Sequence, residues 1–181
     1  MTGAFSGKER GLDLIVARDG DGWTAEYGNK RWRCAVGRGG LRTDKVEGDG
    51  ASPIGRWPIR QVFYRADLMA APAPHFPCHP IDRLDGWCDE PSHPSYNRQV
   101  RLPFEASHEE LWRDDDLYDC VVVLGHNDDP PVAGKGSAVF LHIARPDYSP
   151  TAGCAALSKE DLLAFLALAQ PDTHLVFSGG R

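Results

Sequence analysis

The chain has 181 residues, of which 41% are hydrophobic and 25% charged, and its formal net charge at pH 7 is -6. A chain of this size buries a core without staples, so we expect one domain over residues 1–181, with its core at about 12–177. The acidic balance, with no run of basic residues, argues against a nucleic-acid partner. The apolar runs are far shorter than the ~18 residues of a membrane-spanning helix, so we expect no membrane span.

Glycine and proline are abundant, with 19 and 14 residues respectively. They predict many turns, which favours a β-rich fold over a helix bundle. The first three expected strands, residues 12–18, 23–27 and 31–36, are separated by Asp-Gly and Gly-Asn turns and predict a meander.

The middle of the chain is irregular. Residues 37–53 have no periodicity and five glycines, which predicts a long loop. Residues 55–63 resume a strand, and residues 66–98 form a proline-rich segment whose aromatic residues argue for order. In residues 107–113, Ser107 and Glu110 form a capping-box pattern, which predicts one or two helical turns.

The last third alternates buried strands with one helix. Residues 120–124 and 138–144 are continuous apolar runs, as expected of buried strands. Residues 158–169 predict a helix that Ser158 caps and Pro171 ends. Residues 174–177 read as a final strand.

Cys154 has the strongest claim to chemistry among five cysteines. An odd number of cysteines leaves at least one unpaired in a monomer. Cys154 follows Gly153 on the approach to the capped helix, and His142 lies on the preceding apolar strand. A thiol beside an imidazole is an activated nucleophile, because the imidazole takes the proton. Spacing alone also allows coincidence, with both residues serving only the core.

Longer motifs resemble a known family. The segment SAVFLHIARPDYSPTAGCAAL (residues 137–157) resembles the catalytic signature of the L,D-transpeptidase (YkuD-type) family. Residues 45–59, 87–98 and 108–127 resemble further stretches of the same family. The resemblance implies a mainly β, single-domain sandwich with a few short helices, and the cysteine at the end of a cleft.

The implied reaction is acyl transfer on peptidoglycan stem peptides without a cofactor. Cys154 forms a thioester, His142 acts as base and then as acid, and an amine takes the acyl group. Water in place of the amine gives an L,D-carboxypeptidase. Carbapenems are implied inhibitors. The expected site comprises Cys154 and His142 (catalytic), Gly153 and Ala152 (backbone donors to the oxyanion), and Thr151, Trp87, Tyr96, His126, Asn127 and Arg145 (substrate binding).

Two positions depart from the family pattern. Ala152 stands where many members have His, and Ala156 where many have Arg. The sequence therefore does not assign the residue that binds the substrate carboxylate. The candidates are Arg145, Arg98 and Arg101. We also expect the 45–53 loop or the segment around Trp87 and Tyr96 to wall the cleft.

Two other interpretations stay open. In the first, the chain is a non-catalytic module that binds cell-wall peptide. In the second, it is a non-catalytic module stabilised by zinc. The zinc alternative rests on residues of ligand type that lack paired CxxC spacing, so we predict no metal; these residues are His75, Cys78, His79, Cys88 and His93. The implied substrate places the protein in the cell envelope or periplasm, although residues 1–11 show no signal-peptide pattern.

Overall fold

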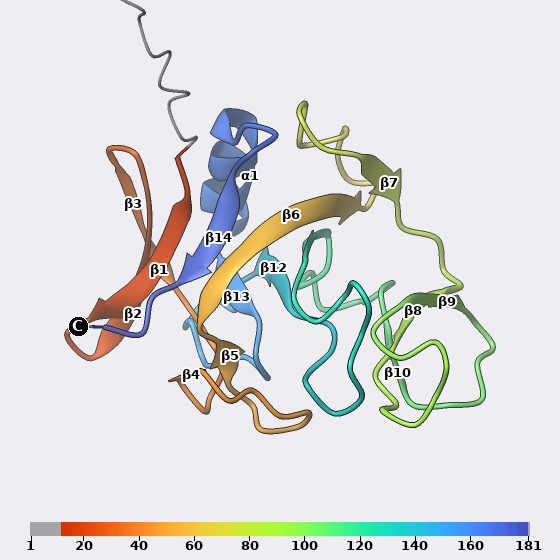
Figure 1. The fold of residues 1–181 in the computed structure, drawn as a ribbon. Helices are drawn as coiled ribbons and strands as arrows, with labels where there is room; N and C mark the ends of the chain where they lie inside the picture. Colours follow the sequence, from red (N-terminus) through yellow and green to blue (C-terminus); the bar gives the residue numbers. More distant parts are fainter. Residues whose placement is uncertain (1–11, 181) are drawn as a thin grey trace, which may run out of the picture.

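The computed structural model describes residues 12–180 and is dominated by one large sheet (Figure 1). Nine strands belong to this sheet, eight of them in the order β13-β12-β11-β6-β14-β1-β2-β3, with β7 paired to β6. The strands are β1 (Leu14–Asp19), β2 (Gly22–Tyr27), β3 (Lys30–Cys34), β6 (Gly55–Tyr64), β7 (Cys78–Pro80), β11 (Cys120–Leu124), β12 (Phe140–Ile143), β13 (Ala155–Leu157) and β14 (His174–Phe177).

The two edges of this path come together. The amide of Ala35, just after β3, donates to the carbonyl of Ala156 in β13, and the amide of Ala156 donates back, each over 2.9 Å. The sheet is thus a nearly closed barrel. The predicted mainly β fold is confirmed. The two packed layers expected of a sandwich are formed largely by one sheet that curls on itself.

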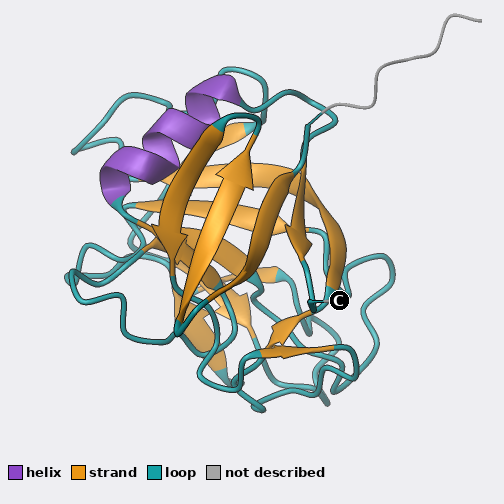
Figure 2. Cartoon of the chain, turned by 90° about the vertical axis from the view of Figure 1, so that its left-hand side faces the viewer, coloured by secondary structure: helices purple, strands orange, loops and turns teal. Residues whose placement is uncertain are grey.

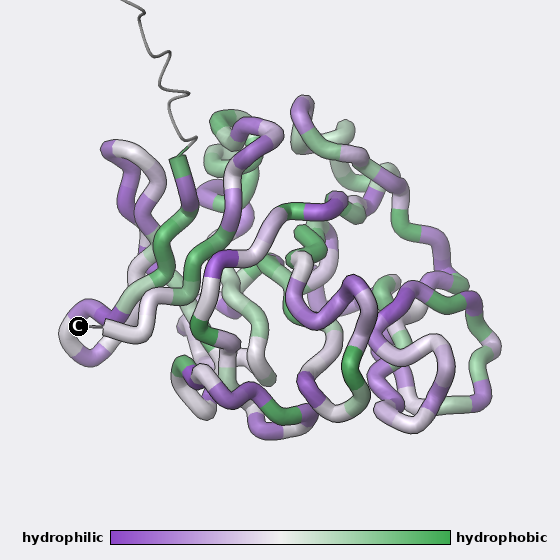
Figure 3. The backbone as a smooth tube through the Cα atoms, in the orientation of Figure 1, coloured by the Kyte–Doolittle hydropathy of each residue, from purple (hydrophilic) through white to green (hydrophobic). Residues whose placement is uncertain are grey.

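The helix α1 (Lys159–Leu168) lies against this curved sheet (Figure 2). Ser158 caps it by accepting a hydrogen bond from the Asp161 amide, as the sequence predicts. Its buried side chains Leu162, Phe165 and Leu166 join the main core with residues from eight strands. The hydropathy pattern agrees, since β1 and α1 carry hydrophobic stretches while the β2–β3 hairpin is largely hydrophilic (Figure 3).

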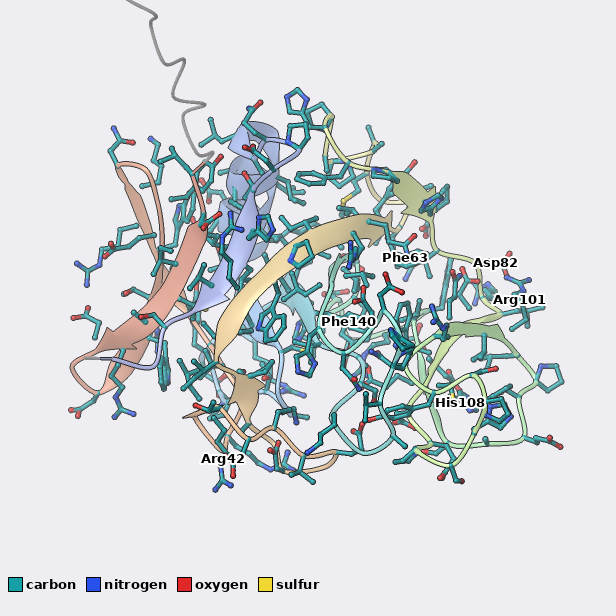
Figure 4. The ribbon with its side chains drawn as sticks, in the orientation of Figure 1. Arg42, Phe63, Asp82, Arg101, His108 and Phe140 are labelled. Carbon is teal, nitrogen blue, oxygen red and sulfur yellow. The ribbon has the colours of Figure 1, made fainter. Side chains whose placement is uncertain are left out.

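A smaller sheet forms a second layer over the outer face of β11 and β12. It has the order β10-β8-β9, with β8 (Asp85–Cys88), β9 (Gln99–Arg101) and β10 (His108–Glu110). Phe63 and Phe140 lie between the two layers (Figure 4), in a second core that also contains Cys154. Burial on both faces explains why β11 reads as a continuous apolar run.

Two features differ from the sequence expectations. The predicted helical turns at residues 107–113 are wrong, because His108–Glu110 form β10 and pair with β8. Tertiary pairing overrides the local capping pattern there. The loop at 37–53 contains a short parallel pair, β4 (Leu41–Arg42) and β5 (Ser52–Pro53). The expectation for residues 1–11 lies outside the described residues, and within 12–180 no helix is long and apolar enough to cross a membrane.

Candidate active site

The turn before Cys154 is fixed by hydroxyl groups. Thr151 Oγ1 accepts from the Gly153 amide at 3.1 Å and donates to the Cys154 carbonyl at 2.7 Å. Gly153 has φ +144°, and a Cβ there would lie 3.0 Å from the Ala51 carbonyl oxygen, so only glycine fits without strain. Thr151 therefore shapes the turn. The Gly153 amide, expected to serve an oxyanion, is already engaged.

The thiol of Cys154 is buried against β12. Its Sγ donates to the Ala138 carbonyl at 3.3 Å and lies 3.4 Å from the Phe140 amide, which donates to it. Burial raises the pKa of the Cys154 thiol to about 12, and the charge of Glu109 adds to this, whereas the Phe140 amide and Lys45 oppose it. At neutral pH the resting thiol is protonated.

His142 lies on β12, next to the strand that Cys154 leads into. The two strands are parallel with Leu141 opposite Ala155. Continuing that register by one residue sets Cys154 beside Phe140, so Cys154 and His142 lie diagonally to each other on one face of neighbouring strands. The second core and the Phe140 contact place Cys154 on this face.

The imidazole of His142 is oriented by its own strand. Its Nδ1 lies 2.9 Å from the Ile143 carbonyl, which only accepts, so Nδ1 carries the proton and Nε2 is the free base. Burial lowers the pKa of His142 to about 4, and Arg113 and Arg145 lower it further, while the Ile143 carbonyl opposes the shift. The resting pair is therefore a neutral thiol and a neutral imidazole.

Two cavities meet at this pair. One, of about 170 Å³, is bordered by Cys154 and Gly153. The other, of about 400 Å³, is bordered by His142 and Thr151. Arg38, Glu109 and Ala152 border both cavities, so the exposed Ala152 marks the junction.

The expected cleft walls are found in part. Lys45, Glu47 and Gly48 of the 37–53 loop and Asp89 of the proline-rich segment border the Cys154 cavity. Lys45 is buried and forms an ion pair of 2.5 Å with Asp49.

Trp87 and Tyr96 border neither of the two cavities. Trp87 Nε1 donates to Asn97 Oδ1 at 3.0 Å, and its ring packs edge-on against Phe140. The Tyr96 hydroxyl donates to Glu47 Oε2 at 2.5 Å, so Tyr96 supports the cavity wall from behind.

Of the remaining residues expected to bind substrate, only Arg145 borders one of the two cavities. Asn127 stabilises its loop through hydrogen bonds to the backbone of Val132 and Gly136. His126 is buried edge-on against Trp57, and burial lowers its pKa to about 4. Arg145 is exposed and borders the His142 cavity. Of the other arginines considered, Arg101 forms ion pairs with Asp82 and Asp85.

The residues of the zinc alternative do not assemble. Across residues 12–180, no group of three or more His, Cys, Asp and Glu side chains is arranged to hold a metal ion. Cys88 is buried within β8, and Cys78 donates to the Ala73 carbonyl from β7.

Several residues of the site were not anticipated from the sequence. Arg38, Glu109, Arg113 and Tyr118 all border the His142 cavity. Tyr118 packs edge-on against His142 with 5.2 Å between ring centroids. No local signal marks these residues, because β10 reads as a helix start and Arg38 lies in a glycine-rich loop.

A known protein family matches nearly the whole chain. The sequence model of the YkuD family, the L,D-transpeptidase catalytic domain, matches residues 14–177. The chain belongs to the L,D-transpeptidase catalytic domain family. The match spans every strand from β1 to β14, so both cavities of this L,D-transpeptidase domain lie within it. No curated protein and no solved structure matches the chain significantly.

Proposed function

We propose that this L,D-transpeptidase domain transfers an acyl group between peptidoglycan stem peptides, with Cys154 as nucleophile and His142 as general base. The observation that carries the proposal is the placement of both side chains on one face of neighbouring strands, with His142 Nε2 left free by the Nδ1 contact to Ile143. Membership of the family supports the substrate class.

The first half-reaction begins from the neutral pair. The raised pKa of Cys154 and the lowered pKa of His142 disfavour a preformed ion pair. The imidazole takes the proton as sulfur attacks the stem-peptide carbonyl, and then returns it to the departing amine of the terminal D-residue. A thioester on Cys154 remains.

The second half-reaction passes the acyl group to an amine. Sulfur leaves as the new amide bond forms, and the thiol is restored. If water replaces the amine, the product is the shortened stem and the activity is that of an L,D-carboxypeptidase. Arg145 and Arg38, both at the His142 cavity, are our candidates for holding the donor carboxylate, because guanidinium groups bind carboxylates in bidentate fashion.

The test is intact-mass analysis with a purified tetrapeptide-stem muropeptide. We expect a covalent adduct on the wild type and on Cys78→Ala, a matched control at a half-buried cysteine outside the site. Cys154→Ala should give no adduct, and His142→Ala should slow adduct formation about a hundredfold or more. A folded wild type that binds the muropeptide without an adduct would support a non-catalytic binding module instead.

A further inference from the structure

Glu109 is a carboxylate at the junction of the two cavities, and the reaction above gives it no role. It lies on β10 and borders both the Cys154 cavity and the His142 cavity. The Tyr118 hydroxyl donates to its Oε2 at 2.6 Å. Burial raises the pKa of Glu109, although the Tyr118 hydrogen bond opposes this shift.

This position is unfavourable for the first half-reaction. A negative charge at Glu109 raises the pKa of the Cys154 thiol beyond the effect of burial. The carboxylate thus opposes formation of the thiolate, and its presence beside the nucleophile calls for a role in another step.

The Cys154 cavity carries more negative than positive charge. Three carboxylates border it, those of Glu47, Asp89 and Glu109. Of its two cations, Lys45 is already neutralised by Asp49, which leaves Arg38. A small polar cavity of this charge suits a cation.

Asp89, a half-buried residue at the same cavity, provides a second observation. Its Oδ1 atom is buried, and it has no hydrogen-bond partner among the described residues. Buried carboxylate oxygens are normally satisfied, so this acceptor fits a donor that arrives with a ligand.

We propose, resting on the proposed function, that Glu109 binds the ammonium group of the acyl acceptor and takes its proton in the second half-reaction. This role takes the amine acceptor of the proposed function in its protonated form. Tyr118 is a positioning residue, because its hydroxyl fixes the Glu109 carboxylate between the cavities.

In this step, two protons leave the acceptor nitrogen. The ammonium gives one proton to the Glu109 carboxylate and becomes a neutral amine. Its nitrogen forms a bond to the thioester carbon, the carbon–sulfur bond breaks, and the electron pair goes to sulfur. The second nitrogen proton passes through His142 to the thiolate, and Glu109 then releases its proton to solvent.

The experiment measures how the acyl-enzyme partitions between amine and water. The donor is the tetrapeptide-stem muropeptide, and the acceptors are a free D-amino acid and, separately, hydroxylamine, which is largely unprotonated at neutral pH. Glu109→Gln is compared with wild type and with Glu110→Gln, the same change at the exposed neighbour on β10. Tyr118→Phe keeps the buried ring and removes only the hydroxyl, so it serves if Glu109→Gln does not fold.

We expect Glu109→Gln to lower the ratio of aminolysis to hydrolysis about a hundredfold with the D-amino acid. Its use of hydroxylamine should be unchanged, and alkylation of its Cys154 by iodoacetamide should be faster at the same pH. Tyr118→Phe should shift the ratio in the same direction but less, and Glu110→Gln should match wild type.

An unchanged ratio in Glu109→Gln, or an equal loss with hydroxylamine, would overturn the proposal. If Glu109→Gln does not fold, an unchanged ratio of aminolysis to hydrolysis in Tyr118→Phe would also overturn the proposal. Failure of the wild type to form an acyl-enzyme would instead refute the proposed function, so the two failures are distinguishable.

Discussion

Ser52 Oγ donates a hydrogen bond of 2.7 Å to the carbonyl of Gly153, so a residue of the first long loop supports the turn that carries Cys154. The same hydroxyl accepts from the Gly37 amide at 3.0 Å, and Ser52 is fully buried. The 37–53 loop therefore hydrogen-bonds to the turn that carries Cys154 and also borders the Cys154 cavity.

Ser52→Ala should lower the free energy of unfolding by about 1–3 kcal/mol, because two buried backbone groups lose a partner. It should also change the alkylation rate of Cys154, since the turn loses its support. Denaturant unfolding and iodoacetamide kinetics measure the two effects. Ser107→Ala, at an exposed serine, is the control and should leave both values within error.

Gly153→Ala should destabilise the turn by about 1–3 kcal/mol, because alanine is strained at φ +144° and its methyl group approaches the Ala51 carbonyl. We expect acylation of Cys154 to fall in parallel. Gly22→Ala is the matched control, since a Cβ there meets nothing closer than 3.8 Å. Equal stability of the two variants would contradict this account of the turn.

Stability should fall in mild acid because of His142. Its pKa drops from 6.5 to about 4 on folding, so the unfolded chain binds the proton first. Above pH 6.5, neutral His142 contributes roughly 3 kcal/mol to the free energy of unfolding, relative to low pH. This contribution is lost as the pH falls towards 4. His142→Gln should flatten this acid limb in denaturant titrations at several pH values. His126 has a similar shift, so His126→Gln should flatten this acid limb as well.

A carbapenem should acylate Cys154 alone among the five cysteines. Cys34 and Cys120 are buried in the main core, where desolvation raises the pKa of each thiol to about 12, as it does for Cys154, but no imidazole base accompanies them there. Intact-mass spectra should show one adduct on wild type and on Cys78→Ala, and none on Cys154→Ala. An adduct that persists in Cys154→Ala would remove the assignment of the nucleophile.

Much of this fold was predictable because its strands have strong local signals. The β1–β3 meander follows from its turn residues, and β11, β12 and α1 follow from apolar runs and the Ser158 cap. The prediction failed where pairing is non-local. β10 has no strand signal of its own and exists because Glu109 pairs opposite Trp87 in β8.

The candidate site was predictable to a similar degree. Cys154 and His142 lie close in sequence on adjacent elements, so their proximity follows from local reasoning. Glu109 and Tyr118 come from other segments, and only the packing of the small sheet on the barrel brings them to the same place. Trp87 and Tyr96 show the opposite case, since aromatic residues in an irregular segment turned out to pack behind the cavities.

The bridge between Ala35 and Ala156 also has a consequence for folding. It joins residues that lie far apart in the sequence, and Cys154 lies two residues before Ala156. Contacts of such long sequence separation form late, because the loop they close is large. During synthesis, an incomplete chain therefore lacks this bridge, and Cys154 acquires its surroundings only once β13 has reached the end of β3.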